Sequence, residues 1–180
     1  MNKCFVYIST VFKLHKLNYL FIILLTCLAA FTRLAPHPPN FTPILSIALF
    51  CGVCFRSKYI FLVPLFAMLI SDFILGFHSV IMYVYFSLLL IFIFGKLVSE
   101  KISYKSTLII SLFSSILFFL ITNFGVWLIG YPKTFSGFIL CYSAAIPFFK
   151  NSLISTLMFS SVFYYCYSYI SNQSFAINKN

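Results

Sequence analysis

The amino-acid sequence predicts an all-α integral membrane protein with a six-transmembrane-helix bundle, and three observations lead to this fold class. Of the 180 residues, 62% are hydrophobic and only 8% are charged, whereas a soluble domain carries roughly a quarter of its residues as charges. The apolar residues fall in runs close to the length of about 20 residues that a helix needs to cross a bilayer. Lysine and arginine lie singly at the ends of these runs, as is typical of membrane proteins.

Six apolar segments follow one another within a single transmembrane domain, residues 17–170. They cover residues 17–35, 41–55, 59–76, 79–98, 107–129 and 148–170. A polar, basic segment (1–16) precedes them, and a polar tail (171–180) follows them. A signal peptide is the alternative for the first segment, but no A-x-A-type cleavage site follows it, so we expect a retained helix.

Three of these regions depart from plain spanning helices. Four prolines between Pro36 and Pro43 preclude a helix interior, because proline lacks an N–H and biases the preceding residue to an extended conformation. The segment 41–55 is short for a full span, so we expect its neighbours to shield it or its start to be extended. Pro64 predicts a kink in the third segment. The stretch 131–147 is too short to span, and it predicts a re-entrant or interfacial segment, or a lid, before the last helix.

The lysines and arginines predict the orientation of the chain. With the N-terminus inside, nine of them lie on inner loops and three on the outer side, namely Arg33, Lys133 and Lys150. Cytoplasmic loops of membrane proteins carry the excess of positive charge. The distribution therefore predicts an even number of spans with both termini in the cytoplasm.

The charged residues also exclude several classes of function. Asp72 and Glu100 are the only carboxylic side chains, and the predicted topology separates them across the membrane. A glycosidase with paired carboxylates and a carboxylate cage for Ca²⁺ or Mg²⁺ are therefore not expected. The net charge of +10 comes from scattered cations, which argues against nucleic-acid binding. The sequence has no Gly-rich phosphate loop and no G-x-S-x-G elbow, so we expect no enzyme, and any uphill transport would need a partner or an ion gradient.

Histidines and cysteines give little support to a metal site. His37 and His78 lie on the outer side with Asp72, but no pair of histidines at i, i+4 fixes a site there. Cys51 and Cys54 have redox or metal-site spacing, yet no second C-x-x-C and no histidine near them in the sequence complete a tetrahedral site. We expect a packing role for these cysteines, no metal and no cofactor.

The unusual polar residues gather near the outer side of the predicted bundle. At 1.5 Å per residue, Arg33, Asp72 and Asn123 lie roughly 24, 20 and 24 Å along their helices from the inner ends. These depths fall in the outer third of a hydrocarbon core about 30 Å thick. Charges there usually face a cavity or each other, so we predict a polar pocket with an Arg33–Asp72 pair in its wall. The alternative is that Arg33 snorkels to the head groups and Asp72 caps its helix.

A second group of residues lies on one face of the fifth segment. Asn123, Trp127 and Tyr131 recur at i, i+4 and i+8, so they share that face near the outer end. An amide offers a ligand both a donor and an acceptor, while Trp and Tyr give flat apolar walls. The alternatives are an aromatic belt at the membrane interface and hydrogen bonding between helices.

Five stretches of the sequence resemble a known family. They are Arg33–Pro43, Ser71–His78, Thr122–Trp127, Tyr131–Pro132 and Cys141–Phe149. They recur in this order in a DUF6580-like family of small, uncharacterised bacterial membrane proteins described as transport proteins. That family is similar to the substrate-binding S components of energy-coupling factor (ECF) transporters. The resemblance covers roughly residues 17–165.

The resemblance implies a protein of the bacterial cytoplasmic membrane that captures a small nutrient, such as a vitamin-like organic solute, from outside. Its partners would be a transmembrane coupling subunit and two cytoplasmic ATPases. The substrate-binding residues carried over from the motifs are Arg33, His37, Asn40, Asp72, His78, Asn123, Trp127 and Tyr131. The main alternative is a non-transporting structural or accessory membrane subunit, in which the same polar residues join the helices. An intramembrane enzyme that uses Asp72 or His78 is a more distant alternative.

Two features depart from the S-component pattern. Small residues at four-residue spacing in the first helix often serve docking in S components, and this sequence has only Thr26 and Ala30 there. Metal-type S components begin with a histidine close after the initiator methionine. This chain begins Met1-Asn2-Lys3 instead, so nickel or cobalt uptake is not expected.

Overall fold

The computed structural model describes residues 24, 27–29, 31–54, 58–98 and 103–177, and this part of the chain contains helices but no β-strand. The elements are α2 (Ile44–Cys54), a short 3₁₀ helix η1 (Lys58–Phe61), α3 (Leu62–Leu75), α4 (Ile81–Val98), α5 (Tyr104–Gly130) and α6 (Phe135–Ile177). Residues 24, 27–29 and 31–34 of the predicted first helix are helical as well. The predicted N-terminal segment 1–16, the docking positions Thr26 and Ala30, and the inner loops at 55–57 and 99–102 lie outside the described residues.

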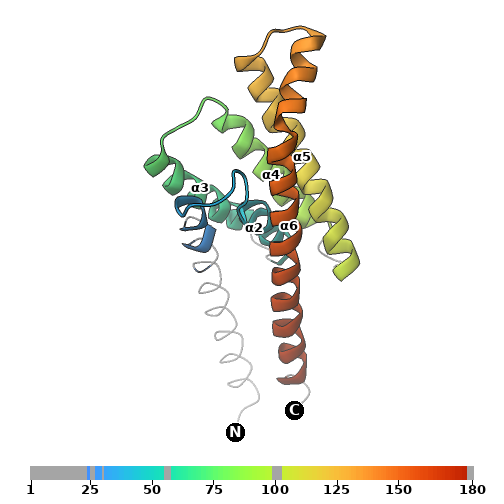
Figure 1. Ribbon diagram of the computed structural model, residues 1–180. Coiled ribbons are helices and arrows are strands. Elements are labelled where there is room, and N and C mark those ends of the chain that lie inside the picture. Colours follow the sequence, from blue (N-terminus) through green and yellow to red (C-terminus); the bar gives the residue numbers. More distant parts are fainter. Residues whose placement is uncertain (1–23, 25–26, 30, 55–57, 99–102, 178–180) are drawn as a thin grey trace.

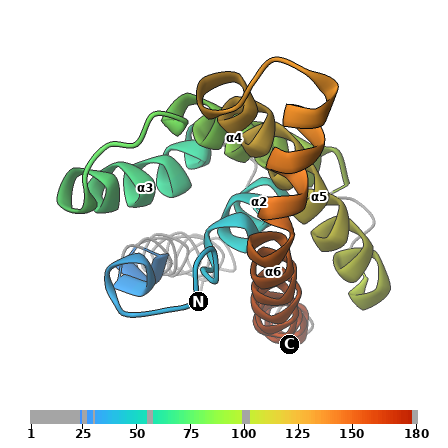
Figure 2. The same ribbon diagram turned by 45° about the horizontal axis from the view of Figure 1, so that its top comes forward.

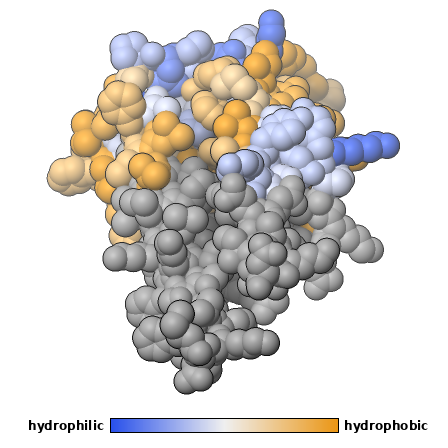
Figure 3. All heavy atoms as spheres, turned by 90° about the horizontal axis from the view of Figure 1, so that it is seen from below, coloured by the Kyte–Doolittle hydropathy of each residue, from blue (hydrophilic) through white to orange (hydrophobic). Residues whose placement is uncertain are grey.

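Three of the described helices, α4, α5 and α6, are long and apolar enough to cross a membrane. The predicted spans 41–55 and 59–76 correspond to α2 and to η1 with α3, which are apolar but shorter. Large hydrophobic side chains lie exposed on the outside of α3, α4, α5 and α6, and Figure 3 shows wide apolar areas on the described part of one face. A surface of this kind is typical of contact with lipid. The described part of the chain is therefore all-helical, and its long apolar helices are typical of a membrane protein.

The helix α2 forms the centre of the molecule. It is apolar on all sides, and every residue from Ile44 to Val53 is buried, which is how such a helix behaves in a large core or a membrane protein. Its 11 residues extend only roughly 16 Å. It packs against α3, α4, α5 and α6, so its neighbours shield it, as its shortness predicts. By contrast, α3 lies at the edge of the bundle, away from α5 and α6 (Figures 1 and 2).

Two glycines bring the backbones of α2 and α4 into direct contact. A Cβ atom added to Gly52 would lie 2.2 Å from the carbonyl oxygen of Phe92, and one added to Gly95 would lie 2.3 Å from that of Leu49. Each glycine therefore lies against the backbone of the other helix. Small residues permit this close approach, which is the usual way in which helices associate in lipid.

The largest difference from the sequence prediction lies before the last helix. We predicted a separate re-entrant segment or lid at 131–147, a helix at 148–170 and a polar tail from residue 171. The structure instead has one helix, α6, that runs from Phe135 to Ile177. Its 43 residues extend about 64 Å, so α6 is longer than the hydrocarbon core, which is about 30 Å thick. The prediction of a segment separate from the last helix is therefore wrong, because the stretch from Phe135 onward is the first part of α6.

A cap and a tolerated proline explain this longer helix. The hydroxyl of Thr134 accepts a hydrogen bond from the N–H of Gly137 (3.1 Å), which satisfies one of the free donors at the start of α6. Pro147 lies inside the helix, and membrane helices tolerate proline where neighbouring groups satisfy the freed carbonyl. Similarly, Pro64 lies in the first turn of α3, where proline is well accommodated, and the 3₁₀ helix η1 directly precedes this turn.

The helices α5 and α6 form an antiparallel hairpin that projects from the bundle (Figure 1). Ser103 caps α5 through reciprocal hydrogen bonds with Ser106, which starts this helix three residues before the predicted boundary. Aromatic rings mark two levels of the hairpin. Tyr104 contacts Tyr164 and Tyr165 at one level, and Trp127 lies about 35 Å farther along α5. This separation is close to the thickness of a hydrocarbon core, as expected for two aromatic belts.

Candidate functional site

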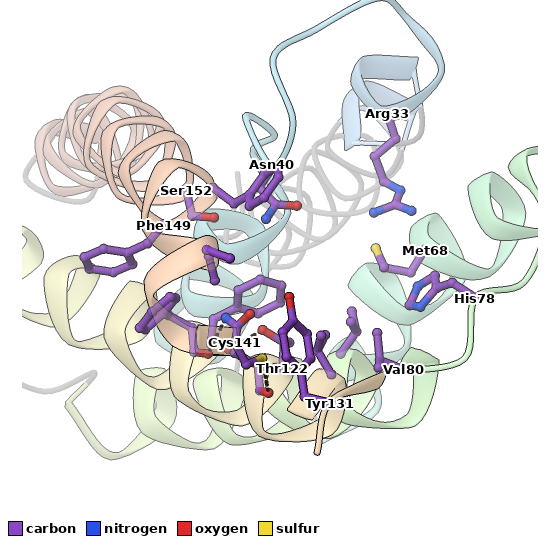
Figure 4. A pocket seen from close by; sticks show the side chains of 18 residues that line it. Arg33, Asn40, Met68, His78, Val80, Thr122, Tyr131, Cys141, Phe149 and Ser152 are labelled. Carbon is purple, nitrogen blue, oxygen red and sulfur yellow. Dashed lines mark hydrogen bonds between the residues drawn. The ribbon is translucent and has the colours of Figure 1, made fainter. Parts of the chain in front are cut away.

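A cavity of about 430 Å³ lies among Arg33, Asn40, α3, α4, α5 and α6. Its size falls within the range of small-molecule sites. Polar side chains in its wall are Arg33, Asn40, His78, Thr122, Asn123, Tyr131 and Ser152. Apolar side chains include Met68, Val84, Val126 and four phenylalanines, namely Phe118, Phe119, Phe148 and Phe149. Figure 4 shows Arg33 and His78 on one side of this cavity and Phe149 on the other.

A second cavity of about 210 Å³ adjoins the first one. The two share part of their walls, including Arg33, Asn40 and Ser152. His37 lines only the smaller cavity, and its ring Nδ1 lies 2.8 Å from the carbonyl oxygen of Ala35. The residues shared by the two walls therefore lie between two adjoining cavities.

The predicted ion pair between Arg33 and Asp72 is present. One guanidinium N–H donates to Asp72 Oδ1 (2.5 Å), and the Arg33 Nε donates to the hydroxyl of Ser71 (2.7 Å). The hydroxyl of Tyr85, on α4, donates to the second carboxylate oxygen (3.1 Å). The Asp72 side chain is only 1% exposed. This network joins the end of the first helix, α3 and α4.

The two members of the pair differ in their relation to the cavity. Arg33 lines both cavities, whereas Asp72 lines neither of them. An arginine has five N–H donors, and two of those of Arg33 serve Ser71 and Asp72. The cavity is therefore in contact with the cation of the pair, while the carboxylate lies behind it.

Asn40 reaches the wall through a fixed turn of the proline-rich loop. Its backbone has a positive φ of 62°, a conformation in which asparagine is enriched among non-glycine residues. The N–H of Phe41 donates to the carbonyl of Pro38 (2.9 Å), and the amide of Asn151 on α6 donates to that of Pro39 (3.0 Å). The loop is thereby attached to α6, and it holds the carboxamide of Asn40 in the wall (Figure 4).

His78 has unused hydrogen-bonding capacity. Its Nδ1 atom is buried and has no hydrogen-bond partner in the described part of the chain, although nearly all buried polar groups in proteins have one. The imidazole lines the larger cavity. Within the described ranges, no three His, Cys, Asp or Glu side chains lie close enough together to hold a metal ion. Because the Nδ1 atom itself is closed off, the imidazole lines the cavity through its other atoms.

Asn123, Tyr131 and Trp127 do not share one role. The amide N–H of Asn123 donates to Phe119 O of its own helix (2.8 Å), and both Asn123 and Tyr131 line the larger cavity. Trp127 does not line it; its indole N–H donates to the carbonyl of Pro132 (3.0 Å). The ammonium of Lys133 lies 5.8 Å from the centre of the indole ring and donates to Trp127 O (2.9 Å). Trp127 thus contributes to the turn between α5 and α6.

The sequence prediction missed Tyr85, Ser152 and the four phenylalanines. Tyr85 and Ser152 lie in apolar helices, and the relative positions of these helices were unknown at that stage. The phenylalanines are four of 25 in the chain, and their residue type alone carries no signal for a cavity. The one signal for Phe148 and Phe149 was that both lie in the motif Cys141–Phe149, which the sequence shares with the family that it resembles.

Comparisons with known proteins identify the family. A family described as a family of unknown function (DUF6580) matches residues 13–177. No curated protein and no solved structure gives a significant match. The matched residues include every side chain of both cavities. Because the match extends over nearly the whole sequence, this chain belongs to the DUF6580 family.

Proposed function

We propose that this protein binds a small organic solute in the larger cavity and takes part in its transport across a membrane. The observation that carries the proposal is a cavity of ligand size whose wall combines the cation of Arg33 and the carboxamides of Asn40 and Asn123 with aromatic side chains. Ligand sites are typically apolar, with a few polar groups that orient the ligand. A small organic solute with a polar end and an apolar end fits such a wall.

The transport function rests on the membrane character of the chain and on the position of the cavity. The residues of α5 that line the cavity, from Phe118 to Val126, lie roughly 21–33 Å along the helix from Tyr104. In the predicted orientation this is the outer part of a bacterial cytoplasmic membrane. The protein would then be a six-span capture subunit, similar to an ECF S component, with both termini in the cytoplasm. A transmembrane coupling subunit and cytoplasmic ATPases would be its partners.

A second candidate function is a structural or accessory membrane subunit. The network of Arg33, Asp72 and Tyr85 favours it, because these side chains join three helices. The carboxylate of Asp72 does not line the cavity, so it is not available to a ligand there. This function requires no solute in the cavity. The two candidates therefore differ in whether the cavity is filled in the cell.

Native mass spectrometry of protein extracted gently from its own membrane tests the proposal. We expect a small-molecule adduct on the wild type and its loss in Ala144→Phe, because Ala144 lines the cavity and a phenyl ring there would occupy it. Ile146→Phe is the matched control: it adds a ring two residues away, on a side chain that is 58% exposed and outside the cavity wall. An adduct that Ala144→Phe retains would contradict the proposed site, and protein partners with an empty cavity would favour the accessory subunit.

A further inference from the structure

The polar part of the cavity wall presents positive charge and hydrogen-bond donors. Arg33 supplies guanidinium N–H groups, and Asn40 supplies a carboxamide from the fixed loop. The carboxylate that balances Arg33 is 1% exposed and lies outside the wall. None of the described residues that line the larger cavity is acidic. A solute in the cavity is therefore in contact with a cation and not with its counterion.

This arrangement matches a carboxylate. The planar guanidinium of an arginine fits the two oxygens of a carboxylate, and hydrogen bonds between charged groups are the stronger kind. The imidazole of His78 lies on the same side of the cavity as Arg33 (Figure 4) and forms part of its wall. An anionic group placed between these two side chains would meet two nitrogen-bearing groups from different elements.

The wall also contains four aromatic rings, and Phe149 lies on the side of the cavity opposite Arg33 (Figure 4). Phe118 and Phe119 come from α5, and Phe148 and Phe149 come from α6. The rings of Phe119 and Phe149 lie 4.8 Å apart at an angle of 45°. Leucine and isoleucine are absent from the described residues of this wall, although both are common in the chain. Aromatic faces favour flat ring systems in offset or edge contacts, more than they favour a flexible alkyl chain.

We infer that the solute is a carboxylic acid with a flat ring system, bound with its carboxylate toward Arg33 and His78 and its ring among the phenylalanines. This inference deepens the proposed function and rests on it. It names the class of solute: an organic monoacid with one apolar, planar end. A free fatty acid shares the carboxylate, but its alkyl chain does not match the aromatic end.

Isothermal titration calorimetry with three probes tests the solute class, using the full chain in phosphatidylcholine nanodiscs. The probes are 2-naphthoate, 2-naphthamide, which keeps the rings but has no charge, and decanoate, which keeps the carboxylate but has no ring. We expect 2-naphthoate to bind at least about tenfold more tightly than either of the others. Titrations of each probe into empty nanodiscs measure the heat of partition into lipid, which is subtracted. The heat that is lost in Ala144→Phe is the heat of binding in the cavity.

Two variants identify the groups that select the acid. His78→Phe removes no hydrogen bond of Nδ1 in the described part of the structure. It should lower the affinity for 2-naphthoate about fivefold without lowering the affinity for 2-naphthamide. Arg33→Gln combined with Asp72→Asn keeps a neutral hydrogen-bonding pair, and it should abolish the preference for the acid over the amide. Ile146→Phe, on the outer surface, should leave all three affinities unchanged. Size-exclusion chromatography verifies that each variant is folded.

Three results would overturn the inferred class: equal affinities for the acid and the amide, tighter binding of decanoate, or no binding of any probe. Undiminished 2-naphthoate binding by His78→Phe would overturn the role of the imidazole. None of these results depends on the extracted adduct that tests the proposed function. If the wild type carries an adduct that Ala144→Phe lacks while the probes behave in one of these ways, the proposed function stands and the solute class is wrong.

Discussion

The contact between α2 and α4 and the cavity near the opposite end of α4 show two ways in which α4 meets its neighbours. At the contact, Gly52 and Gly95 place backbone against backbone. Eleven residues before Gly95, Val84 of the same α4 lines a cavity of about 430 Å³. Close packing therefore depends on residues without side chains. The cavity, by contrast, is lined by large aromatic rings from α5 and α6. The comparison teaches that the size of the side chains decides where this bundle is filled and where it is hollow.

The polar groups of the two regions differ in the same way. Between α2 and α6, the hydroxyl of Ser46 donates to the carbonyl of Thr156 (3.0 Å), and that of Ser160 donates to Ser46 (3.0 Å). These hydroxyls serve contacts between helices. At the cavity, the guanidinium of Arg33 and the carboxamide of Asn40 lie in the wall. The hydroxyls between α2 and α6 thus bond to groups of the protein, whereas the cavity wall presents polar side chains that can meet a ligand.

The largest expected effect comes from breaking the ion pair beside the cavity. Asp72→Ala leaves the guanidinium of Arg33 without its counterion, and we expect a loss of about 3–5 kcal/mol in the free energy of unfolding. Unfolding by denaturing detergent, followed by circular dichroism, measures it. The double variant Arg33→Met with Asp72→Leu should be less destabilised than Asp72→Ala, because it leaves no unpaired charge. A single variant as stable as the wild type would mean that the pair does not hold these helices together.

The next effect tests the packed region. Gly52→Ala places a Cβ atom 2.2 Å from a backbone carbonyl oxygen, and we expect a loss of about 3 kcal/mol, at the upper end for overpacking. Gly130→Ala is the matched control, because no atom lies within 4 Å of its added Cβ, and we expect a change of at most about 1 kcal/mol. Equal thermal stabilities of these two variants in detergent would show that the contact between α2 and α4 is not close.

A smaller effect separates the backbone of the proline-rich loop from its side chain. Asn40→Ala should cost about 1 kcal/mol, because alanine resists the positive φ at this position. Asn40→Gly should preserve the stability, since glycine adopts this conformation readily, but it should reduce the amount of co-purified solute. Thermal unfolding together with mass spectrometry of the released solute measures both quantities. Normal solute binding by Asn40→Gly would show that the carboxamide of Asn40 does not contribute to binding.

The smallest effect concerns Trp127, the residue that the sequence placed in the pocket wall. Trp127→Phe removes the N–H that donates to Pro132 O, and we expect a loss of about 0.5 kcal/mol. The amount of bound solute should not change, because Trp127 does not line the cavity. Mass spectrometry of the extracted protein measures this amount. Loss of the solute in this variant would show that Trp127 is needed for solute binding.

Several parts of the site could be predicted because few residues can play the roles in question. Asp72 is one of only two carboxylic residues in the chain, and Arg33 was the only opposite charge available at its predicted depth, so their pairing followed from elimination. Asn40, His78 and Asn123 line the same cavity; His78 and Asn123 were expected on the outer side from the topology, and Asn40 was expected at the site from the family resemblance. Tyr85 could not be found in this way, since tyrosines are frequent here and the register of α3 against α4 was unknown.

The sequence by itself determined the helical membrane character of this protein, because composition and the length of apolar runs are properties of the chain alone. It also indicated α4 to within two residues of its start. The start of α6 needed the cap at Thr134 and the tolerance of Pro147, which are matters of local contacts. Only the tertiary structure decided that α2 lies in the centre and that four phenylalanines face a cavity. A helix that is apolar on all sides has no polar face to reveal its orientation, so packing against its neighbours decides which side chains meet lipid, protein or solute.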